Sequence, residues 1–518
     1  MIILLRLTFS LVSIACFIPL ASIAQKFTTV TSEPVTFSPE SKVIPYGNQY
    51  ISMEKSNAIL HTSFKFNLYK YKFHYKLYQQ DKTMQLVKEV KLNNGDRVYG
   101  PFSSTLKKIN QKLYFVYFNM DVDTDEGPIH LMAAEVDTVS LGLLPPNELM
   151  TIDFKESKSR FTWSNIDEWD KLFVEQSPDH KNTLVSWSSG IDNLYFYAVL
   201  DTNLKPVWSK NGSIELVDKL RLESSCIDNK ANVYLALKGL LANELENSYI
   251  VFGTQKVADK DVAIGIIDGK ASSINLVAAS NEDVVKVTGT YKTGKNPNLF
   301  GVYYTSVKAG ERRLGKIQIT PFTEEVLKEL KHDEWSNLKE KYLGIYDKID
   351  MAAYEHQNGN VDMLGMFRQM EFNVKNSSFI VTGDILCTHF SNGKATFSRV
   401  PKYRVSAGST IGDSYAVFVH NNETIVFYND NEKNLLKDLK DNATNSNVYK
   451  DVVLIAATIA EGQVVKREKV IDLKNDNYMA VPNWIVQSGA GKLLAPILKV
   501  KGMGGISKES RFATITIQ

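Results

Sequence analysis

The feature that most constrains the fold is a strand–turn–strand unit that recurs along the chain. Its clearest copy, residues 172–210, reads LFVEQSPDHKNTLVSWSSGIDNLYFYAVLDTNLKPVWSK. Short runs of aromatic and β-branched residues alternate there with turns rich in Pro, Asp, Asn and Gly, which is typical of antiparallel strands joined by tight turns. We therefore expect strands at 184–187, 193–200 and 205–209.

A turn marker, an acidic or amide residue after an apolar strand, returns at a regular distance. The markers are Asp81, Asp137, Asp201, Asp268, Asn392 and Glu461. The successive intervals are 56, 64, 67, 124 and 69 residues, so the fourth interval spans about two periods. A period of this size is typical of a four-stranded propeller blade. The sequence therefore predicts an all-β fold, a β-propeller of about seven blades, with six or eight as alternatives.

One stretch has the pattern of a helix. In 321–342, Thr323 can cap a helix whose first turn carries Glu324 and Glu325. We expect a short helical insertion there, packed on the outside of a blade. The Asn-rich segment 430–448 is expected to form a long exposed loop.

The N-terminus has the pattern of a secretory signal. Arg6 is the only charged residue in 1–24, and an apolar stretch and small residues follow it. This pattern predicts cleavage between Ala24 and Gln25 and export to the periplasm or the exterior.

Two alternatives to a cleaved signal stay open, an uncleaved signal anchor and a lipoprotein processed at Cys16. The apolar run is short for a bilayer span, and no later run is long enough, so we expect no transmembrane segment after cleavage. Beyond the signal, we expect an irregular lead-in at 25–62, with one strand near 42–46, and a propeller domain at 63–518.

Composition and charge limit the classes of partner. Hydrophobic residues make up 44% and charged residues 23% of the chain, which is typical of an ordered globular protein. Loss of Arg6 with the signal leaves 59 cationic against 58 anionic side chains, a net charge of +1. Without a basic cluster, the sequence offers no electrostatic basis for binding nucleic acid. Cys226 and Cys387 remain, and we favour two separate buried thiols over a disulfide.

Asp121, Asp123 and Asp125 form the candidate metal site. Carboxylates at alternate positions can converge on a hard cation such as calcium. The segment departs from an EF-hand loop, because Glu126 stands where that loop has Gly and Met132 where it has Glu. A solvated hairpin loop is therefore the simpler interpretation, and calcium is the one candidate cofactor.

The sequence contains no recognisable catalytic motif. Residues 289–296 approach a phosphate-binding loop, but Asn296 stands where that motif needs Ser or Thr, and a strand is expected next, so we expect a hairpin turn. The sequence has neither an HExxH zinc motif nor a Gly-x-Ser-x-Gly elbow. Tryptophans could stack on sugars but are better explained as blade core.

Seven short motifs lie between about residue 70 and the C-terminus. They are 177–179 (SPD), 201–208, 228–234 (DNKANVY), 301–304 (GVYY), 383–386 (GDIL), 400–402 (VPK) and 427–430 (FYND) with Asn434. Together they resemble a group of exported bacterial propeller-like proteins of unknown function. The chain departs from that group after Gly365, where Met366 and Phe367 replace Glu and an aromatic residue, and after Lys402, where a usual Gln is missing. The resemblance implies a propeller fold and export, and it implies no activity.

The leading hypothesis for function is a non-catalytic binding or scaffold protein of the cell envelope or exterior, whose loops contact a protein or a glycan. The alternative is a carbohydrate-active propeller enzyme, a hydrolase or lyase. An enzyme should hold a carboxylate pair or a His, Tyr and Arg cluster in a funnel. A binding protein should present a flatter apolar or aromatic patch. A third hypothesis, a propeller subunit docked on a membrane complex, is not separated from the first by the sequence.

Overall fold

The structure is a computed structural model, and its placed residues fall into separate ranges. It describes residues 27–36, 42–46, 49–63, 68–81, 85–92, 105–120, 128–152, 172–188, 193–215, 217–241, 246–255, 261–267, 270–293, 298–329, 336–337, 344–345, 349–372, 378–407, 412–444, 452–473, 477–501 and 505–518. Residues 1–24, predicted to be a signal segment, lie outside these ranges. None of the described helices is long and apolar enough to cross a bilayer.

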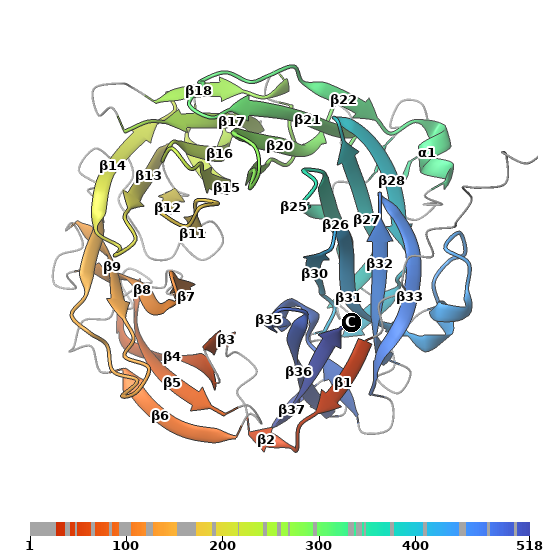
Figure 1. Ribbon diagram of the computed structural model, residues 1–518, viewed down its shortest axis with the longest axis horizontal. Coiled ribbons are helices and arrows are strands. Elements are labelled where there is room, and N and C mark those ends of the chain that lie inside the picture. Colours follow the sequence, from red (N-terminus) through yellow and green to blue (C-terminus); the bar gives the residue numbers. More distant parts are fainter. Residues whose placement is uncertain are drawn as a thin grey trace, which may run out of the picture.

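Eight antiparallel sheets of four or more strands stand around a central axis in the described ranges, as the blades of a β-propeller (Figure 1). Blade 1 comprises β3 (Lys42–Tyr46), β4 (Gln49–Ser63), β5 (Leu68–Gln80) and β6 (Leu86–Leu92). Blade 2 comprises β7 (Thr105–Ile109), β8 (Lys112–Met120), β9 (Ile129–Glu135) and β10 (Asn147–Ile152). Blade 3 comprises β11 (Phe173–Gln176), β12 (Thr183–Ser188), β13 (Leu194–Leu200) and β14 (Pro206–Ser213).

The next four blades follow in chain order. Blade 4 comprises β15 (Lys219–Ile227), β16 (Val233–Leu240), β17 (Glu246–Gly253) and β18 (Val262–Gly265). Blade 5 comprises β19 (Asn275–Ala278), β20 (Val284–Tyr291), β21 (Gly301–Lys308) and β22 (Gln318–Pro321). Blade 6 comprises β25 (Ile349–Glu355), β26 (Val361–Phe372), β27 (Ser378–Ser391), β28 (Lys394–Val400) and β29 (Arg404–Ala407). Blade 7 comprises β30 (Tyr415–His420), β31 (Glu423–Asn431), β32 (Val452–Ala460) and β33 (Gln463–Asp472).

The eighth blade joins the two ends of the chain. It comprises β34 (Tyr478–Ala480), β35 (Val486–Gly489), β36 (Lys492–Lys501), β37 (Gly505–Ile517), β1 (Phe27–Thr31) and β2 (Val35–Thr36). Its outer strand β1 pairs with β37, from Phe27 opposite Ile517 to Thr31 opposite Ala513. This pairing covers the edge that β37 would otherwise expose, and so closes the ring.

The β-propeller prediction is confirmed, with eight blades, within the expected range of six to eight and one above the favoured seven. The sequence markers counted turns between the third and fourth strands of a blade. Blade 8 has no such turn, because its fourth strand comes from the N-terminus. The marker Asp268 lies outside the described residues, in the connection from β18 to β19, and therefore falls between blades.

The segment 25–62 is not an irregular lead-in, and the propeller does not begin at residue 63. The structure assigns β1 to blade 8 and β3 and β4 to blade 1. The single strand expected near 42–46 matches β3. The mixed polar and apolar composition of this segment hid these strands.

Middle strands of each blade form the core. Strand β32 is buried almost throughout, whereas its outer neighbour β33 alternates between exposed and half-buried positions. Neighbouring blades cover both faces of a middle strand, so it reads as a continuous apolar run. Cys226 on β15 and Cys387 on β27 belong to this buried core and are both free. Burial raises the pKa of both thiols.

The helical insertion is present but shorter than the pattern predicted. Helix α1 (Glu324–Glu329) begins after Thr323, whose Oγ1 accepts a hydrogen bond from the Val326 amide at 3.4 Å. Residues 330–335 lie outside the described ranges. The short strands β23 (Ser336–Asn337) and β24 (Gly344–Ile345) show that the helix does not extend to 342.

The segment 430–448 is not simply an exposed loop. Asp430 is buried in β31, one residue before its end, and a 3₁₀ helix, η5 (Glu432–Leu436), follows the strand. The buried Asn434 amide donates to both Asp430 carboxylate oxygens, at 2.9 and 3.0 Å. Side-chain hydrogen bonds within the segment therefore order a stretch whose polar composition predicted exposure.

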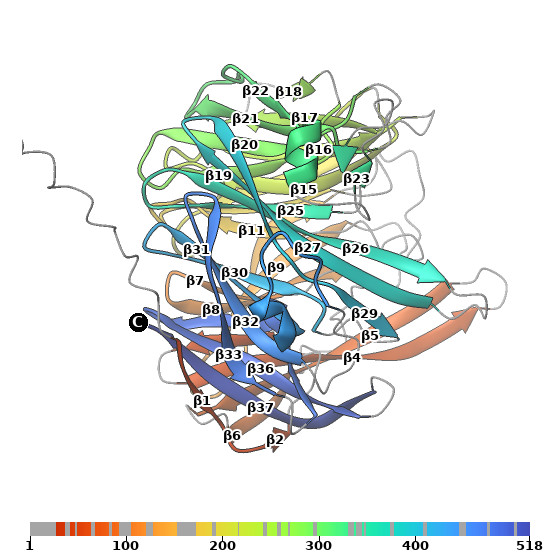
Figure 2. The same ribbon diagram turned by 90° about the vertical axis from the view of Figure 1, so that its right-hand side faces the viewer.

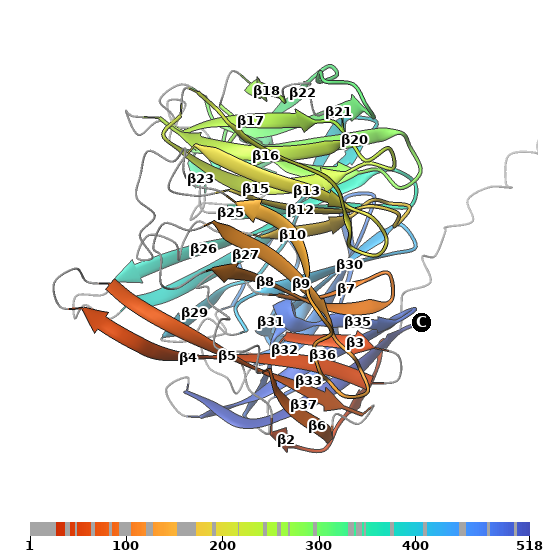
Figure 3. The ribbon, with the colours of Figure 1, turned by 90° about the vertical axis from the view of Figure 1, so that its left-hand side faces the viewer.

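The two faces of the ring differ. The main path of each blade holds four strands in alternating directions, so the first strands of all blades run the same way. The connections from second to third strand lie where the first strands begin, and we call this side the hairpin face. The long hairpins β4–β5 and β26–β27 both project from it (Figures 2 and 3). The opposite side, with the turns between first and second strands, is the turn face.

Candidate functional site

A cavity of about 760 Å³ opens in the wall of the central channel. Its lining comes mainly from the first, innermost strands of blades 3 to 7, and includes Phe173, Glu223, Asn275, Met351, Arg368 and Tyr415. Phe173, Asn275 and Tyr415 are the first residues of β11, β19 and β30. The cavity therefore lies towards the hairpin face. Its volume is within the range of small-molecule sites, about 300 to 1,000 Å³.

The cavity offers one exposed cation and two aromatic rings. Arg368 is exposed and follows a shift of register in the β26–β27 pairing, between Met366 and Arg368. Such irregularities re-aim side chains and are frequent beside binding sites. The Tyr415 hydroxyl donates to the Leu364 carbonyl at 3.1 Å, which fixes the ring against the wall. Glu223 is paired with Arg221, with 2.5 Å between Oε1 and Nε.

A second candidate is a buried cluster of two histidines and one carboxylate at the turn-face end of blade 6. Asp362 Oδ2 lies 3.0 Å from His356 Nε2, and Asp362 Oδ1 lies 2.6 Å from His389 Nδ1. Thr424, on β31 of blade 7, donates its hydroxyl to Asp362 Oδ2 at 2.6 Å. Burial by itself raises the pKa of Asp362, but these hydrogen bonds outweigh it and lower the pKa to about 2.

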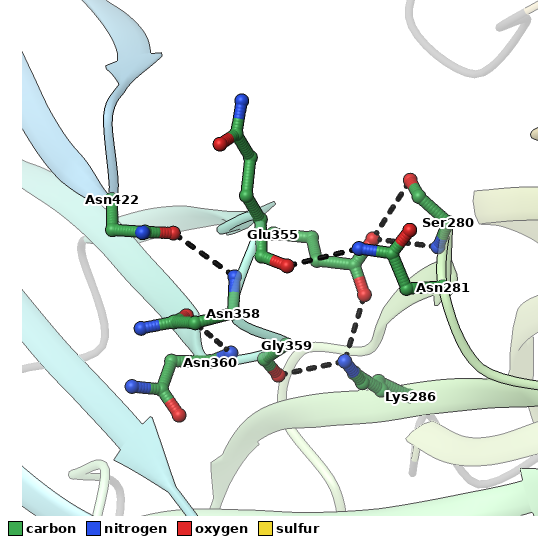
Figure 4. A network of polar contacts seen from close by, with 9 residues as sticks. Ser280, Asn281, Lys286, Glu355, Asn358, Gly359, Asn360 and Asn422 are labelled. Carbon is green, nitrogen blue, oxygen red and sulfur yellow. Dashed lines mark hydrogen bonds and ion pairs between the residues drawn. The ribbon is translucent and has the colours of Figure 1, made fainter.

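A polar network holds the turn that carries His356 (Figure 4). Lys286, buried in blade 5, donates to Glu355 Oε1 and to the Gly359 carbonyl, both at 2.7 Å. From the other side, the Asn358 amide donates to Asn422 Oδ1 of blade 7 at 2.9 Å. The β25–β26 turn is thus tied to both neighbouring blades, and this limits the movement of His356.

A third polar cluster lies between blades 6 and 7. Lys402 is buried and donates from Nζ to the Asp413 carbonyl at 2.9 Å, and its amide donates to Asp384 at 2.9 Å. Arg399 pairs with Asp384 at 2.7 Å. Burial lowers the pKa of Lys402 to about 8 and raises the pKa of Asp430 to about 7.

Three motifs of the resemblance meet in this third cluster. Asp384 comes from GDIL, Lys402 from VPK and Asp430 from FYND. The motifs therefore mark a buried polar contact between two blades. Since these ionisable groups are almost fully buried, we assign them to blade packing and not to a ligand site.

The structure confirms some of the expectations for residues singled out in the sequence and does not describe others. Asp121, Asp123 and Asp125 lie outside the described residues, in the connection between β8 and β9. Trp187 and Trp208 are buried in the blade core, as expected. Gly289 lies within β20, and a strand, β21, follows it, which agrees with a hairpin and not with a phosphate-binding loop.

Sequence reasoning missed both the cavity and the histidine cluster. His356 and Asp362 are six residues apart and His389 follows after 27 more, a spacing that matches no metal motif. The only local signal was the position of each residue at the end of a strand.

Comparisons with known proteins assign this chain to no family. No family model matches the sequence, and no curated protein is detectably similar to it. Among solved structures, the polysaccharide lyase Uly1 has a TM-score of 0.38 at 10% sequence identity, with 83% of this chain and 93% of that chain covered. The WD40 domain of SCAP from fission yeast has a TM-score of 0.39 at 7% identity, with 95% and 98% covered. A Synechocystis apocarotenoid oxygenase has 0.36 at 7%, with 86% and 92% covered. At such values we carry over no function, ligand or residue role.

Proposed function

We propose that this chain is an exported, non-catalytic β-propeller that binds a glycan in the channel cavity on its hairpin face. The cavity carries the proposal, because its volume suits a few sugar rings and exceeds what a flat protein contact requires. Export is supported by the signal pattern of residues 1–24.

The chemistry of the lining supports a polar ligand with an anionic group. Arg368 supplies a guanidinium that can pair with a carboxylate or sulfate in a forked geometry. Phe173 and Tyr415 supply aromatic faces, and Ser224 and Asn275 supply hydrogen-bonding groups. An acidic glycan would use all three kinds of contact.

We favour binding over catalysis because the described lining of the cavity holds a single carboxylate. A glycosidase needs two carboxyl groups on opposite sides of the scissile bond. Among the described residues that line the cavity, Glu223 is the one carboxylate, and Arg221 already pairs with it. The carbohydrate-active enzyme stays as the alternative and is an outcome of the test below.

The test measures binding of acidic and neutral oligosaccharides to the purified chain by calorimetry. We expect an acidic oligosaccharide to bind, and Arg368→Ala to weaken that binding by about 10-fold or more, as for loss of a charged hydrogen bond. The matched control is Arg313→Ala, because Arg313 is exposed away from the cavity and pairs with Glu311. Equal binding by Arg368→Ala and wild type, or no binding by any glycan, would contradict the proposal.

Two further measurements separate the remaining claims. Mass spectrometry of the bound oligosaccharide after prolonged incubation should show it intact, and shortened products would favour the enzyme. N-terminal sequencing of chain recovered from the periplasm should begin at Gln25. A chain retained in the cytoplasm with residues 1–24 attached would contradict export without affecting the binding claim.

A further inference from the structure

The buried cluster of His356, Asp362 and His389 has the donor set of a transition-metal site. Two imidazole nitrogens and one carboxylate oxygen are ligands that zinc and its neighbours in the first transition row prefer. The three donor atoms lie within 4.8 Å of one another, and all three residues are buried. Within the described part of the chain, this is the one place where three such donors converge.

The fold brings these donors together through strand register. Asp362 on β26 lies directly opposite His389 on β27, so their side chains emerge side by side from one face of blade 6. His356 begins the β25–β26 turn, where its amide donates to the Asn360 carbonyl at 2.9 Å. All three positions therefore belong to rigid elements and not to a free loop.

The surroundings resemble the supporting shell of a metal site. Thr424 donates to the Asp362 carboxylate, and its hydroxyl lies 3.2 Å from His356 Nε2. The network in Figure 4 ties the turn at His356 to blades 5 and 7 through Lys286 and Asn422. Hydrogen bonds of this kind orient metal ligands, and their loss typically weakens metal binding about 10- to 100-fold.

The donor atoms are closer together than the ligands of a bound metal ion, as hydrogen-bonded groups are. Zinc bonds of about 2.0 to 2.2 Å in a tetrahedron place neighbouring donors about 3.3 to 3.5 Å apart. Here the carboxylate oxygens lie 2.6 and 3.0 Å from the two imidazole nitrogens. Small rotations of the three side chains would open these contacts enough to admit an ion.

We propose that His356, Asp362 and His389 bind a divalent transition-metal ion, with zinc as the expected occupant. The fourth position would be taken by Thr424 or by a water molecule. Because a carboxylate can only accept hydrogen bonds, the contacts of Asp362 in the metal-free cluster require a proton on His356 Nε2 and another on His389 Nδ1. Binding frees these two nitrogens, and the protons move to the other ring nitrogens or to solvent.

The site lies at the turn-face end of blade 6, whereas the channel cavity lies towards the hairpin face. An ion there would join the turn before β26 to the end of β27, and Thr424 would link the site to blade 7. Its expected effect is to stabilise the contact between blades 6 and 7, so the proposal is independent of glycan binding.

The experiment uses the purified chain after removal of metals with a chelator. We expect stoichiometric zinc by elemental analysis, a raised thermal midpoint with zinc, cobalt or nickel, and no rise with calcium or magnesium. His389→Gln should lose the zinc and the rise in midpoint, and Thr424→Val should bind zinc about 10- to 100-fold more weakly. The matched control is His130→Gln, because His130 is half-exposed and lies 3.3 Å from Glu148 in blade 2.

Two results would overturn the proposal. One is a wild-type chain that retains no zinc, or no more than His389→Gln retains. The other needs no variant: X-ray absorption on the zinc-loaded wild type should show two imidazole ligands, and a spectrum with fewer places the ion elsewhere. That second measurement decides the matter even if His389→Gln does not fold.

Discussion

Phe27 in β1 lies opposite Ile517 in β37, so the first and last described strands of the chain are hydrogen-bonded neighbours. The Phe27 ring also packs edge-on against Phe427 of blade 7, with 5.6 Å between centroids. Closure of the ring therefore combines backbone pairing with an apolar contact to the preceding blade.

Truncation of this aromatic contact should destabilise the whole propeller. Phe27→Ala removes a half-buried ring, and we expect a loss of about 2 kcal/mol in the free energy of unfolding. Val30 on the same strand is 72% exposed, so Val30→Ala should change stability by less than about 0.5 kcal/mol. Denaturant unfolding followed by tryptophan fluorescence measures both, and equal losses would refute a packing role for Phe27.

The buried pair Lys286–Glu355 should contribute far more than an exposed pair between blades. Lys286→Met removes the donor to Glu355 Oε1 and to the Gly359 carbonyl, with an expected loss of about 3 to 5 kcal/mol. Lys230 and Asp283 also join two blades but are 54% and 53% exposed, so Lys230→Met should cost less than about 1 kcal/mol. Thermal unfolding of the two variants should differ clearly. A similar fall in midpoint would show that burial of the pair is unimportant.

Asp362 should make stability depend on pH in the acid range. Its folded pKa of about 2 is lower than the ordinary 3.8. A carboxyl with a lowered folded pKa stabilises the fold above its unfolded pKa, and this stabilisation is lost as pH falls from about 4 towards 2. Asp362→Asn should therefore lose less stability than wild type over that interval, measured as the thermal midpoint at each pH. Parallel curves would argue against the hydrogen bonds to His356 and His389.

Asp430 should behave in the opposite sense. Burial raises its pKa to about 7, so its neutral form favours the fold, and that contribution is lost as pH rises from about 4 to 7. Asp430→Asn should gain stability relative to wild type over this interval. The same midpoint measurement tests it, and a variant that instead falls behind wild type as pH rises would mean that Asp430 is charged in the fold.

Gly289 should not tolerate a side chain. A Cβ at this position would lie 1.9 Å from the Ser273 carbonyl oxygen, which also accepts a hydrogen bond from Tyr303 at 2.9 Å. Gly289→Ala should therefore cost at least about 2 kcal/mol. At Gly489 the nearest atom would be 3.8 Å away, so Gly489→Ala is the control and should be close to neutral. A stable Gly289→Ala chain would show that Ser273 can move.

The turns could be predicted from the sequence because each one depends on residues that are close together in the chain. Asp201 accepts hydrogen bonds from the amides of Asn203 and Lys205, at 2.8 and 2.9 Å, as a short acidic side chain in a turn is expected to do. Asn392 and Glu461 adopt positive φ at 50° and 49°, each followed by a glycine. These contacts involve only residues a few positions apart, so the turns and the approximate period followed from them.

The number of blades could not be predicted from local sequence patterns. The eighth blade depends on β1 finding β37 across the length of the chain, and no period records that contact. The histidine cluster and the channel cavity could not be predicted from local patterns either. Asp362 meets Thr424 of the next blade, and the cavity collects residues of five blades, so their spacing in the sequence carries no signal.

By itself, the sequence determined an all-β repeat fold, its turns, its buried middle strands and the position of one short helix, because each depends on neighbouring residues and on which faces are apolar. Only the tertiary structure decided that eight blades close through the chain ends and that Lys286 joins the turn at Glu355. It also decided that His356, Asp362 and His389 share one buried point, because strand register and contact between blades bring together side chains that the sequence keeps apart.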